Sequence, residues 1–412
     1  MSTVRTTPIG YLVSQYPAAN HTFVLREILE IRNLGREVRV ASIRRPDRAI
    51  EKLSLEEQQE ERTSFYVKSQ GMRGFLAANL RILLRQPVRY VSAVLYAIRL
   101  ARGPRSAAYN LAYLAEAAIV VNWLERHAIR RLHMHFTSTV GLFVERLTPV
   151  FASATMHGSD EFRDPAGFYL PEKISKFRLI VAISDYGLEQ LHKCSTLDSR
   201  SKLHVVRLGV RPELYLPRPF RNSPECYQLL FVGRLEPVKN VPILLGALAR
   251  LVSEGRRVRL TLIGDGTERA SLESEVAHLG VNRQVCFLGR QTPEQVRSSY
   301  QGTDVFCLPS LMEGIPVVLM EAMAMAIPCI ATPVGGVREL IRDQVDGLLV
   351  SPSNEDELVV ALRRLLDDSD LRRSLGTAGR ERVSKDYNLQ RNVKQLAALL
   401  DAAVEQQSEK SF

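Results

Sequence analysis

The chain has 412 residues and a net charge of +10, with 45% hydrophobic and 24% charged residues. This length exceeds what one hydrophobic core usually organises, because domains commonly hold about 100 to 200 residues, so we expect two domains. The composition is that of a globular protein and excludes the fibrous and wholly disordered classes.

The cysteines are odd in number, scattered, and form no C-x-x-C pair. This pattern argues against a disulfide framework and against a zinc site, and it fits a reducing cytoplasm. The five residues are Cys194, Cys226, Cys286, Cys307 and Cys329.

The apolar stretch that begins at Thr7 is too short for a signal peptide and predicts a buried first strand. The most apolar helical stretch, 107–124, is interrupted by Glu116 and Asn122. It falls short of the ~20 apolar residues that a membrane-spanning helix needs. We therefore expect no transmembrane helix and a cytoplasmic location.

The first half of the chain, residues 1–207, predicts a Rossmann-like domain, since apolar strand-like runs alternate with helical patterns. The strands are expected near Ile9, Val38, His133, Ala154 and Leu179. A basic helical insertion, about 68–106, separates the second strand from the third.

The insertion has a charge pattern of its own, because no Asp or Glu occurs between Lys68 and Arg105. Apolar residues at near-helical spacing lie between the basic ones. Two interpretations remain open: a solvated helix pair packed on the domain, or a surface for an anionic membrane. Nucleic acid is not expected, since no recognition motif accompanies the charge. The basic residues are Lys68, Arg73, Arg81, Arg85, Arg89, Arg99, Arg102 and Arg105.

A proline-rich linker is predicted at 208–226, and a second Rossmann-like domain at 227–388. A last helix is expected at 389–404, followed by a frayed polar tail at 405–412. The expected strands are 227–233, 258–264, 285–289, 304–310, 328–332 and 347–350, and the expected helices between them are 241–254, 268–279, 293–300, 316–326 and 337–342. Parallel sheets of this kind bind ligands at the carboxyl ends of their strands, so two facing domains would form a cleft.

The strongest chemical signal lies between Glu313 and Glu321. A strand is followed by Glu313 and Gly314, and Pro316 is expected at the first position of a helix. The amides at a helix start form an anion site, which Gly314 lets a phosphate approach closely. One carboxylate therefore precedes a phosphate site and the other follows it, as a nucleoside diphosphate sugar would require.

Other loops at strand ends add to this signal. Arg234 and Lys239 follow the strand that ends at Gly233, and two cations there can neutralise a diphosphate leaving group. The Gly264-Asp-Gly turn is a weak dinucleotide signal, because Arg269 stands where a third glycine belongs. Gly335 and Gly336 precede another helix and offer a further backbone approach point.

Together these motifs resemble the retaining glycosyltransferases of family 4, which have the GT-B fold, and in particular those of exopolysaccharide and colanic-acid biosynthesis. The resemblance implies two facing Rossmann-like domains with an interdomain cleft and a C-terminal helix that crosses back to the first domain. It implies that Arg234 and Lys239 bind the diphosphate, that Glu321 binds the ribose, and that Glu313 and the backbone after it bind the donor sugar. The remaining donor-side residues are Gly233, Gly264, Leu288 near the base, Gly314, Ile315 and Pro316.

In the first domain, the segment from His157 to Asp160 resembles the His-Gly-x-Asp loop of the same family. The resemblance implies that His157 lies at the reacting centre and that Asp160 lies near the acceptor. The loop that contains Asn20 and His21 is expected to face the acceptor as well. His133 and His135 share one strand face, but two ligands without a third make a poor metal site, so they are expected to be structural or to line the cleft.

The sequence therefore predicts transfer of a sugar, with retention, from a nucleoside diphosphate sugar to a hydroxyl. His157, Glu313, Arg234 and Lys239 are the candidate catalytic residues. No cofactor and no metal are expected, and UDP is slightly favoured over GDP. Asp368 and Asp370 form an Asp-x-Asp at a helix junction, where capping is expected.

The acceptor is expected to be a saccharide, with a lipid-linked one favoured, used in cell-surface polysaccharide assembly on the inner face of the cytoplasmic membrane. Two other classes of protein fit the same motifs. A sugar-nucleotide epimerase or a phosphorylase of the GT-B fold would use a similar donor site, and a non-catalytic scaffold would bind the nucleotide without turnover.

Overall fold

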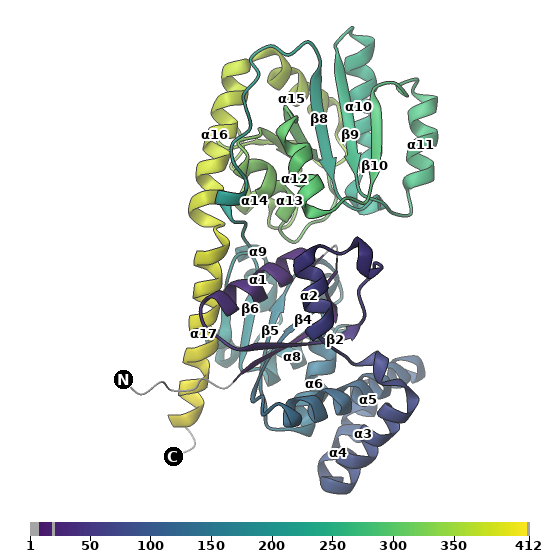
Figure 1. The fold of residues 1–412 in the computed structure, drawn as a ribbon, viewed down its shortest axis with the longest axis vertical. Helices are drawn as coiled ribbons and strands as arrows, with labels where there is room; N and C mark the ends of the chain where they lie inside the picture. The colour runs from purple at the N-terminus through teal and green to yellow at the C-terminus, as the bar shows by residue number, and fades with distance from the viewer. Residues whose placement is uncertain (1–7, 19–20, 410–412) are drawn as a thin grey trace. The chain divides into compact units, whose positions relative to one another are not determined.

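The computed structural model describes residues 8–18 and 21–409 (Figure 1). The chain forms two compact units. The first comprises residues 1–206 and 393–412, and the second comprises residues 207–392. The C-terminal segment thus returns to the unit that contains the N-terminal half of the chain. Residues 208–226, predicted as a linker, are part of the second unit.

The first unit is built on a parallel sheet of seven strands in the order β3-β2-β1-β4-β5-β6-β7. Its central strands are almost wholly buried, as expected for a parallel sheet covered on both faces, although β4 carries Arg131, His133 and His135. The strands are β1 (Ile9–Gln15), β2 (Val38–Arg44), β3 (Phe65–Tyr66), β4 (Arg131–His135), β5 (Phe151–Met156), β6 (Leu179–Ala182) and β7 (Leu203–Val205).

The helices of this unit bury apolar faces against the sheet and against one another. The last helix, α17, joins the unit through Asp401, which pairs with Arg36 and Arg131 at 2.5 and 3.1 Å. The helices are α1 (Thr22–Asn33), α2 (Leu55–Thr63), α3 (Gly71–Arg85), α4 (Pro87–Leu100), α5 (Pro104–Arg126), α6 (Ser138–Leu147), α7 (Ser159–Arg163), α8 (Leu170–Lys176), α9 (Asp185–Lys193) and α17 (Leu389–Glu409).

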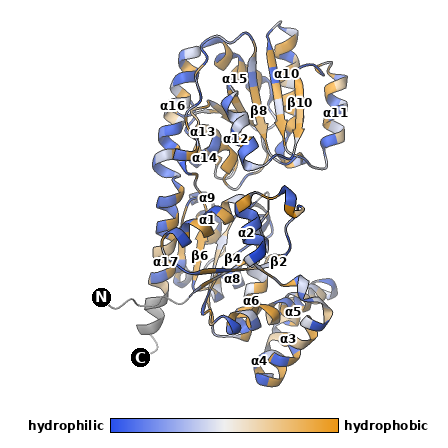
Figure 2. Ribbon diagram, in the orientation of Figure 1, coloured by the Kyte–Doolittle hydropathy of each residue, from blue (hydrophilic) through white to orange (hydrophobic). Residues whose placement is uncertain are grey.

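The predicted basic insertion is a helical hairpin formed by α3 and α4, which pack on α5. Both helices carry apolar and hydrophilic residues along their length (Figure 2), and their charged residues are all arginines. The buried residues of the pair are Ala78, Ile82, Ala93 and Ala97. Large apolar side chains on the remaining surface are 51% to 82% exposed: Met72, Leu76, Leu80, Leu84, Val88, Val91, Leu95 and Ile98. The hairpin therefore has a small buried face and an unusually apolar exposed one.

The second unit contains a parallel sheet of six strands in the order β10-β9-β8-β11-β12-β13. The strands alternate with helices along the chain, which is the arrangement of a doubly wound sheet. They are β8 (Tyr227–Val232), β9 (Val258–Ile263), β10 (Val285–Gly289), β11 (Val305–Leu308), β12 (Cys329–Ala331) and β13 (Leu348–Leu349). The helices are α10 (Val241–Ser253), α11 (Arg269–His278), α12 (Pro293–Gln301), α13 (Val317–Ala324), α14 (Val337–Leu340), α15 (Glu355–Asp367) and α16 (Ser369–Asp386).

Every strand predicted from the sequence is present, to within a few residues at each end. The short strands β3 and β7 and the helices α15 and α16 were not predicted. The predicted end of the last helix at 404 was wrong, because α17 continues to Glu409 and includes much of the supposed tail. Asp368 caps α16 as predicted, with its carboxylate accepting from the amide of Leu371 at 2.8 Å.

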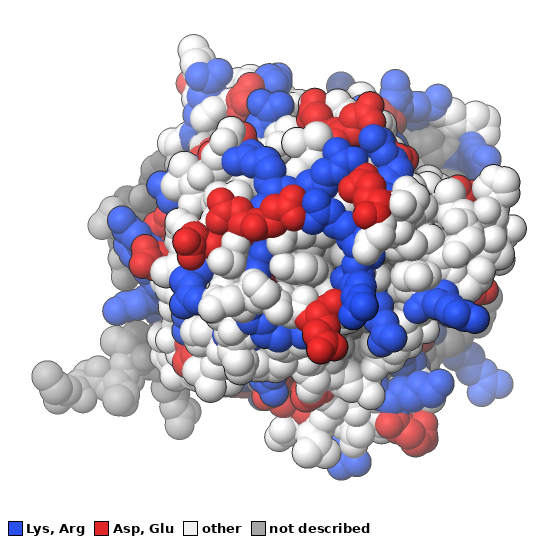
Figure 3. All heavy atoms as spheres, turned by 90° about the horizontal axis from the view of Figure 1, so that it is seen from above, with Lys and Arg blue, Asp and Glu red and all other residues white. Residues whose placement is uncertain are grey.

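Within the described residues, no helix is long and apolar enough to cross a membrane, as the sequence predicted. Figure 3 shows one face of the molecule on which Lys and Arg side chains lie beside Asp and Glu. Such mixing is typical of a solvated protein surface. It contrasts with the hairpin, whose helices contain no acidic residue.

Candidate active site

The carboxyl ends of β8 and β11 mark the topological switch point of the second sheet, where ligands bind in doubly wound folds. The loop after β8 contains Gly233, Arg234 and Lys239, and the loop after β11 contains Glu313 and Gly314. The two segments that the sequence singled out therefore lie at neighbouring strand ends.

Lys239 and Glu313 form a direct ion pair, with 2.5 Å between Nζ and Oε1. The same carboxylate oxygen accepts from the hydroxyl of Ser310 at 2.7 Å. Both side chains of the pair are mostly buried, with exposed fractions of 15% for Lys239 and 10% for Glu313. A carboxylate and an ammonium group are thus fixed beside each other, and one ligand that contacts both would meet opposite charges.

Glycine is required where these loops touch through their backbones. A Cβ atom on Gly335, whose φ is +52°, would lie 1.8 Å from the carbonyl oxygen of Glu313. The amide of Gly336 donates to the carbonyl of Gly314 at 2.7 Å. The loop after β12 therefore supports the backbone of the Glu313 loop directly, and any side chain at position 335 would push it away.

The helix after Glu313 starts one residue later than predicted. Pro316 is the N-cap residue, with φ −80° and ψ 114°, and α13 begins at Val317. The prediction of Pro316 at the first helical position was wrong, because its ψ is that of extended backbone. Within the described residues no side chain caps this helix start, which leaves its first amides available to an anion. Ile315 is buried beside it.

Glu321 is deeply placed, with 6% of the residue exposed. Its carboxylate accepts hydrogen bonds from the hydroxyls of Tyr215 and Tyr300, at 2.7 and 3.4 Å. Burial, together with Glu321, raises the pKa of Tyr300 well above its usual value, so this tyrosine remains a donor. Two tyrosines therefore orient the carboxylate that the resemblance assigns to the ribose.

The remaining donor-side residues are more open. Arg234 is exposed and forms no hydrogen bond or ion pair with the described residues. Leu288, on the edge strand β10, is 41% exposed. Gly264 has φ +135°, and a Cβ there would lie 1.8 Å from the carbonyl oxygen of Gly233. The predicted donor-side residues thus form two groups. Those around Lys239 and Glu313 contact one another closely, whereas Arg234 and Leu288 are exposed.

The switch point of the first sheet lies between β1 and β4, and it is built from histidines and aromatic rings. The ring of Phe136 stacks on His157 and on His21, with centroids 4.4 and 4.2 Å apart. Phe136 has φ +61°, a left-handed conformation that is strained for a residue with a bulky side chain. The ring of Phe23 also belongs to this group, with its centroid 4.9 Å from that of His157.

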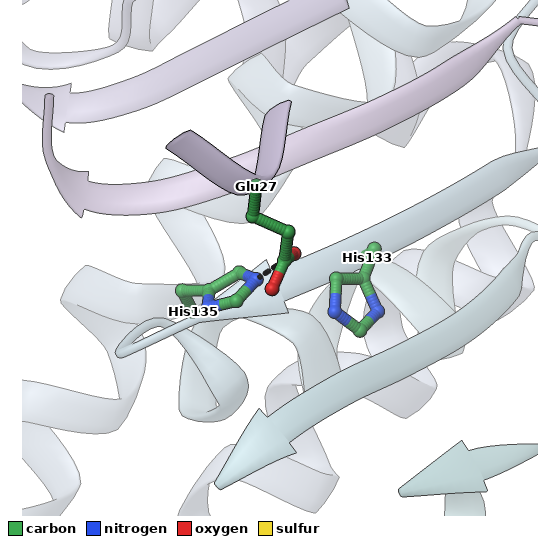
Figure 4. Close-up of side chains that lie close together, drawn as sticks. All are labelled: Glu27, His133 and His135. Carbon is green, nitrogen blue, oxygen red and sulfur yellow. Dashed lines mark hydrogen bonds and ion pairs between the residues drawn. The ribbon is translucent and has the colours of Figure 1, made fainter. Parts of the chain in front are cut away.

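A chain of buried hydrogen bonds leads from α1 to His157. Oε1 of Glu27 accepts from the hydroxyl of Tyr11 at 2.8 Å and lies 3.1 Å from Nε2 of His135 (Figure 4). Nδ1 of His135 lies 2.8 Å from Nε2 of His157. Burial favours the protonated carboxyl, but His135 and Tyr11 outweigh it and hold the pKa of Glu27 below its usual value.

The ionised Glu27 fixes the direction of one hydrogen bond in this series. A carboxylate only accepts, so Nε2 of His135 donates to it. Burial lowers the pKa of His157 well below its usual value, which keeps that ring neutral. Nδ1 of His157 is buried and has no hydrogen-bond partner among the described residues.

A neutral histidine that is linked in this way to a carboxylate is suited to taking a proton from a hydroxyl. The arrangement combines the neutral ring of His157 with the buried counter-charge of Glu27.

His133 completes the cluster shown in Figure 4. Sequence reasoning found no third group beside His133 and His135, but Glu27 lies with them. The ring nitrogens of His133 are both 2.9 Å from hydroxyl oxygens, those of Ser153 and Thr155. A metal ion would have to displace these bonds, and the hydrogen-bonded arrangement accounts for every ring nitrogen of His133 and His135. Their predicted structural role agrees with this burial.

The remaining acceptor-side predictions have mixed outcomes. Asp160, on α7, is exposed and pairs with Arg163 at 3.3 Å. It nevertheless lines the same cavity as His157. Asn20 lies outside the described residues, whereas His21 stacks on Phe136 as given above.

Comparison with known proteins identifies the family. The profile described as "Glycosyl transferases group 1" matches residues 218–382. Over 303 residues, the chain is 31% identical to an uncharacterized glycosyltransferase of Methanocaldococcus jannaschii, in an alignment that covers 68% of this chain and 77% of that protein. The chain belongs to the group 1 glycosyltransferases.

Two further likenesses extend over the whole of this glycosyltransferase. It is 27% identical to WcaL of Escherichia coli K12, named for colanic acid biosynthesis, over 96% of this chain and 99% of that protein. A crystal structure of Anabaena Alr3699/HepE with UDP and glucose has a TM-score of 0.72 at 17% identity, covering 96% of this chain and 100% of that one. The fold is therefore GT-B, with two Rossmann-like domains.

The matched family region contains all predicted donor-side residues of the glycosyltransferase, from Gly233 to Glu321. The Glu27, His135 and His157 chain lies outside it. Sequence reasoning missed Glu27 and Phe136. One signal was present: Glu27 is an acidic residue on the apolar face of α1, among Val24 and Ile28.

Proposed function

We propose that this chain is a retaining, metal-independent glycosyltransferase of family 4 that transfers a sugar from a nucleoside diphosphate sugar to a hydroxyl. The observation that carries the proposal is the Lys239–Glu313 pair at the switch point of the second sheet, beside the uncapped start of α13. The cation and the helix amides suit a diphosphate leaving group, and the carboxylate suits sugar hydroxyls.

The donor we propose is a UDP-sugar. The Anabaena protein of the same fold has been crystallised in complex with UDP and glucose, and also with UDP-glucose. The base would lie near Leu288 and the ribose near Glu321. Arg234, which is exposed after β8, would close on the diphosphate as a second cation.

A donor screen tests this assignment. UDP-, GDP- and ADP-sugars would be compared by nucleotide release with and without saccharide acceptors, and the anomeric configuration of the product would be read by NMR. We expect acceptor-dependent release from UDP-sugars with retention. An inverted product would contradict the mechanism, and donor turnover that is as fast without acceptor as with it would indicate an epimerase or a hydrolase. Donor binding without any release would indicate a scaffold.

We propose that the acceptor is a lipid-linked saccharide of a cell-surface polysaccharide, used at the cytoplasmic face of the membrane. The name of WcaL places that relative in colanic acid biosynthesis. The hairpin supports a membrane surface, because its eight exposed apolar side chains lie on helices that contain arginines and no acids. Each basic residue near an anionic leaflet adds about 1 kcal/mol, and buried apolar side chains add to this.

Vesicle flotation tests the membrane surface. The full chain should float with anionic vesicles and not with neutral ones, and salt should weaken the binding. Replacing Leu84 and Val88 by Ser removes apolar area without changing charge, while Arg62→Gln on α2 serves as a surface control. Equal flotation with anionic and neutral vesicles, or unchanged flotation of the Leu84 and Val88 variant, would contradict the proposal.

A further inference from the structure

The first unit contains a large cavity, of about 850 Å³, at the carboxyl ends of its strands. Segments that follow β2, β4 and β5 form one side, where His157 and Phe136 lie. The start of α5 and the loop before it, residues 102–106, form another. A cavity of this size accommodates a ligand of several sugar rings.

The lining of this cavity contains more cationic than acidic residues. Lys68 and Lys173 are neutralised within it, by Glu116 at 3.5 Å and by Glu161 at 2.9 Å. Arg102 is 3.6 Å from Asp164, and both side chains are more than half exposed, so this pair is weak.

Two arginines of the cavity are not neutralised in this way. Arg44, at the end of β2, and Arg105, in the first turn of α5, form no ion pair within the described part of the chain. Both are exposed to the solvent of the cavity rather than packed against protein. The charge of Arg44 also acts on the buried Glu116, whose pKa burial nevertheless raises. A protonated Glu116 would leave Lys68 without its counter-charge, so the cavity has a positive excess under either protonation state.

Part of the lining of this cavity is suited to sugar. Phe136, Phe168 and Tyr109 are each 39% to 53% exposed and line the cavity. Aromatic faces pack against the apolar faces of sugar rings, while the neighbouring hydroxyls and carboxylates hydrogen-bond the ring substituents. The lining of the cavity therefore combines aromatic side chains that suit sugar rings with cationic side chains.

We propose that this cavity is the acceptor site and that Arg44 and Arg105 bind a phosphate or diphosphate group that the acceptor carries. The inference rests on the proposed function and adds the chemical class of the acceptor. A phosphate or diphosphate group is favoured over a single carboxylate, because it offers more negative charge and more acceptor oxygens and can therefore bind two unpaired arginines at once.

The position of the hairpin along the chain relates the cavity to the proposed membrane surface. Arg102 and Arg105 flank the turn that joins α4 to α5, and Leu95 and Ile98 are exposed on the last turns of α4. A lipid tail on the apolar face of the hairpin would thus be followed by its phosphate group at the arginines and by its saccharide beside His157. One acceptor would account for the hairpin, the arginines and the aromatic wall together.

Binding of inorganic pyrophosphate to the full chain tests the site. The titration would use an Arg234→Ala, Lys239→Ala background, which removes the cations of the donor site. We expect saturable binding that Arg44→Gln with Arg105→Gln weakens roughly tenfold or more, since two cationic groups that can form charge-assisted hydrogen bonds are lost. Arg62→Gln, an equal loss of exposed charge on α2, should leave binding unchanged.

Three results would overturn the proposal. They are the absence of pyrophosphate binding in this background, binding that Arg44→Gln with Arg105→Gln does not alter, and binding of glucuronate as tight as that of pyrophosphate. The last result would assign the arginines to a carboxylate sugar instead.

Activity separates this proposal from the proposed function. In the otherwise unaltered chain, Arg44→Gln with Arg105→Gln should raise the KM for phosphate-linked acceptors and leave the KM for donor and slow donor hydrolysis unchanged. A neutral acceptor of the same saccharide should show no such rise. If no variant and no donor supports any transfer, the proposed function fails, whereas equal effects on neutral and phosphate-linked acceptors contradict only the phosphate subsite.

Discussion

The two sheets have the same architecture but opposite chemistry at their switch points. At the carboxyl ends of β8 and β11, Lys239 and Glu313 form a charged pair, and the helix start after Glu313 has no side-chain cap within the described residues. Between β1 and β4, the neutral ring of His157 lies among aromatic rings, and the carboxylate of Glu27 is two hydrogen bonds away.

This difference matches the two halves of a glycosyl transfer. A diphosphate leaving group gains negative charge as the bond to the sugar breaks, so cations and helix amides are needed on its side. An acceptor hydroxyl is neutral and loses a proton, so a neutral nitrogen with a distant counter-charge is the better partner. Substitutions at each switch point can therefore test whether it has the role that its chemistry indicates.

The largest effect is expected at the charged pair. Lys239→Ala and Glu313→Ala should each lower kcat/KM for donor by about 100-fold, as for loss of one group that stabilises developing charge. Because the two side chains act as one unit, the double variant should be little worse than either single one. Steady-state kinetics would measure this. If the loss of kcat/KM in the double variant equals the product of the two single losses, the two side chains act independently. Near wild-type rates in either single variant would show that this residue is not part of the donor site.

The second largest effect is expected at Gly335, which supports the loop that contains Glu313. Gly335→Ala should lower kcat/KM for donor roughly tenfold, because the new Cβ meets the carbonyl oxygen of Glu313 and positive φ costs about 1 kcal/mol or more. Gly302→Ala is the matched control, since nothing lies within 4 Å of a Cβ built there. Equal activity of the two variants would show that the loop contact is dispensable.

The second sheet could be predicted closely from the sequence, and the first only in outline. Gly233, Lys239, Glu313 and Gly335 each follow a strand within a few residues, so local patterns locate them. The Glu27 to His135 contact joins residues 108 positions apart, and Glu27 resembles any polar position on a helix until α1 is packed on the sheet. Only tertiary structure brings such residues together.

The ends of helices and the shortest strands were also predicted poorly from the sequence. Sequence placed Pro316 inside α13, because proline favours the first turn of a helix, yet here its ψ is extended and it caps the helix instead. The tail after 404 is polar, and polarity was taken as fraying, but Glu and Gln are good helix formers and α17 continues through them. The missed strands β3 and β7 are two and three residues long, too short for a periodic pattern.

A smaller effect than that of Gly335 is expected from Glu27→Gln, because this residue acts through His135 and His157. The amide keeps the size of the side chain but removes the counter-charge, so kcat should fall several-fold, up to about tenfold, with little change in donor KM. The pH profile of kcat should also shift. Glu30→Gln is the control, since Glu30 is a buried acid on the same helix that lies outside the hydrogen-bond chain. Identical pH profiles for the two variants would reduce Glu27 to a structural role.

The smallest effect concerns stability and should be confined to the first unit. Burial lowers the pKa of His133 from 6.5 to about 3. The unfolded chain takes up a proton at His133 below pH 6.5, while the folded chain does not, so this contribution to stability is complete above pH 6.5 and is lost as the pH falls toward 3. Between pH 6.5 and 5 the loss amounts to about 2 kcal/mol, at 1.36 kcal/mol for each pKa unit.

Trp123 is the single tryptophan and lies in the core of the first unit, so its fluorescence reports the unfolding of that unit in urea. His133→Asn should begin less stable at pH 7, because the hydrogen bonds to Ser153 and Thr155 change, but should lose about 2 kcal/mol less than the unaltered chain on going to pH 5. His192→Asn, on α9 away from the cluster, should keep the slope of the unaltered chain. If His133→Asn also keeps that slope, the neutral histidine is not the source of acid sensitivity, and the contrast between neutral buried rings at the first switch point and a charged pair at the second loses its thermodynamic support.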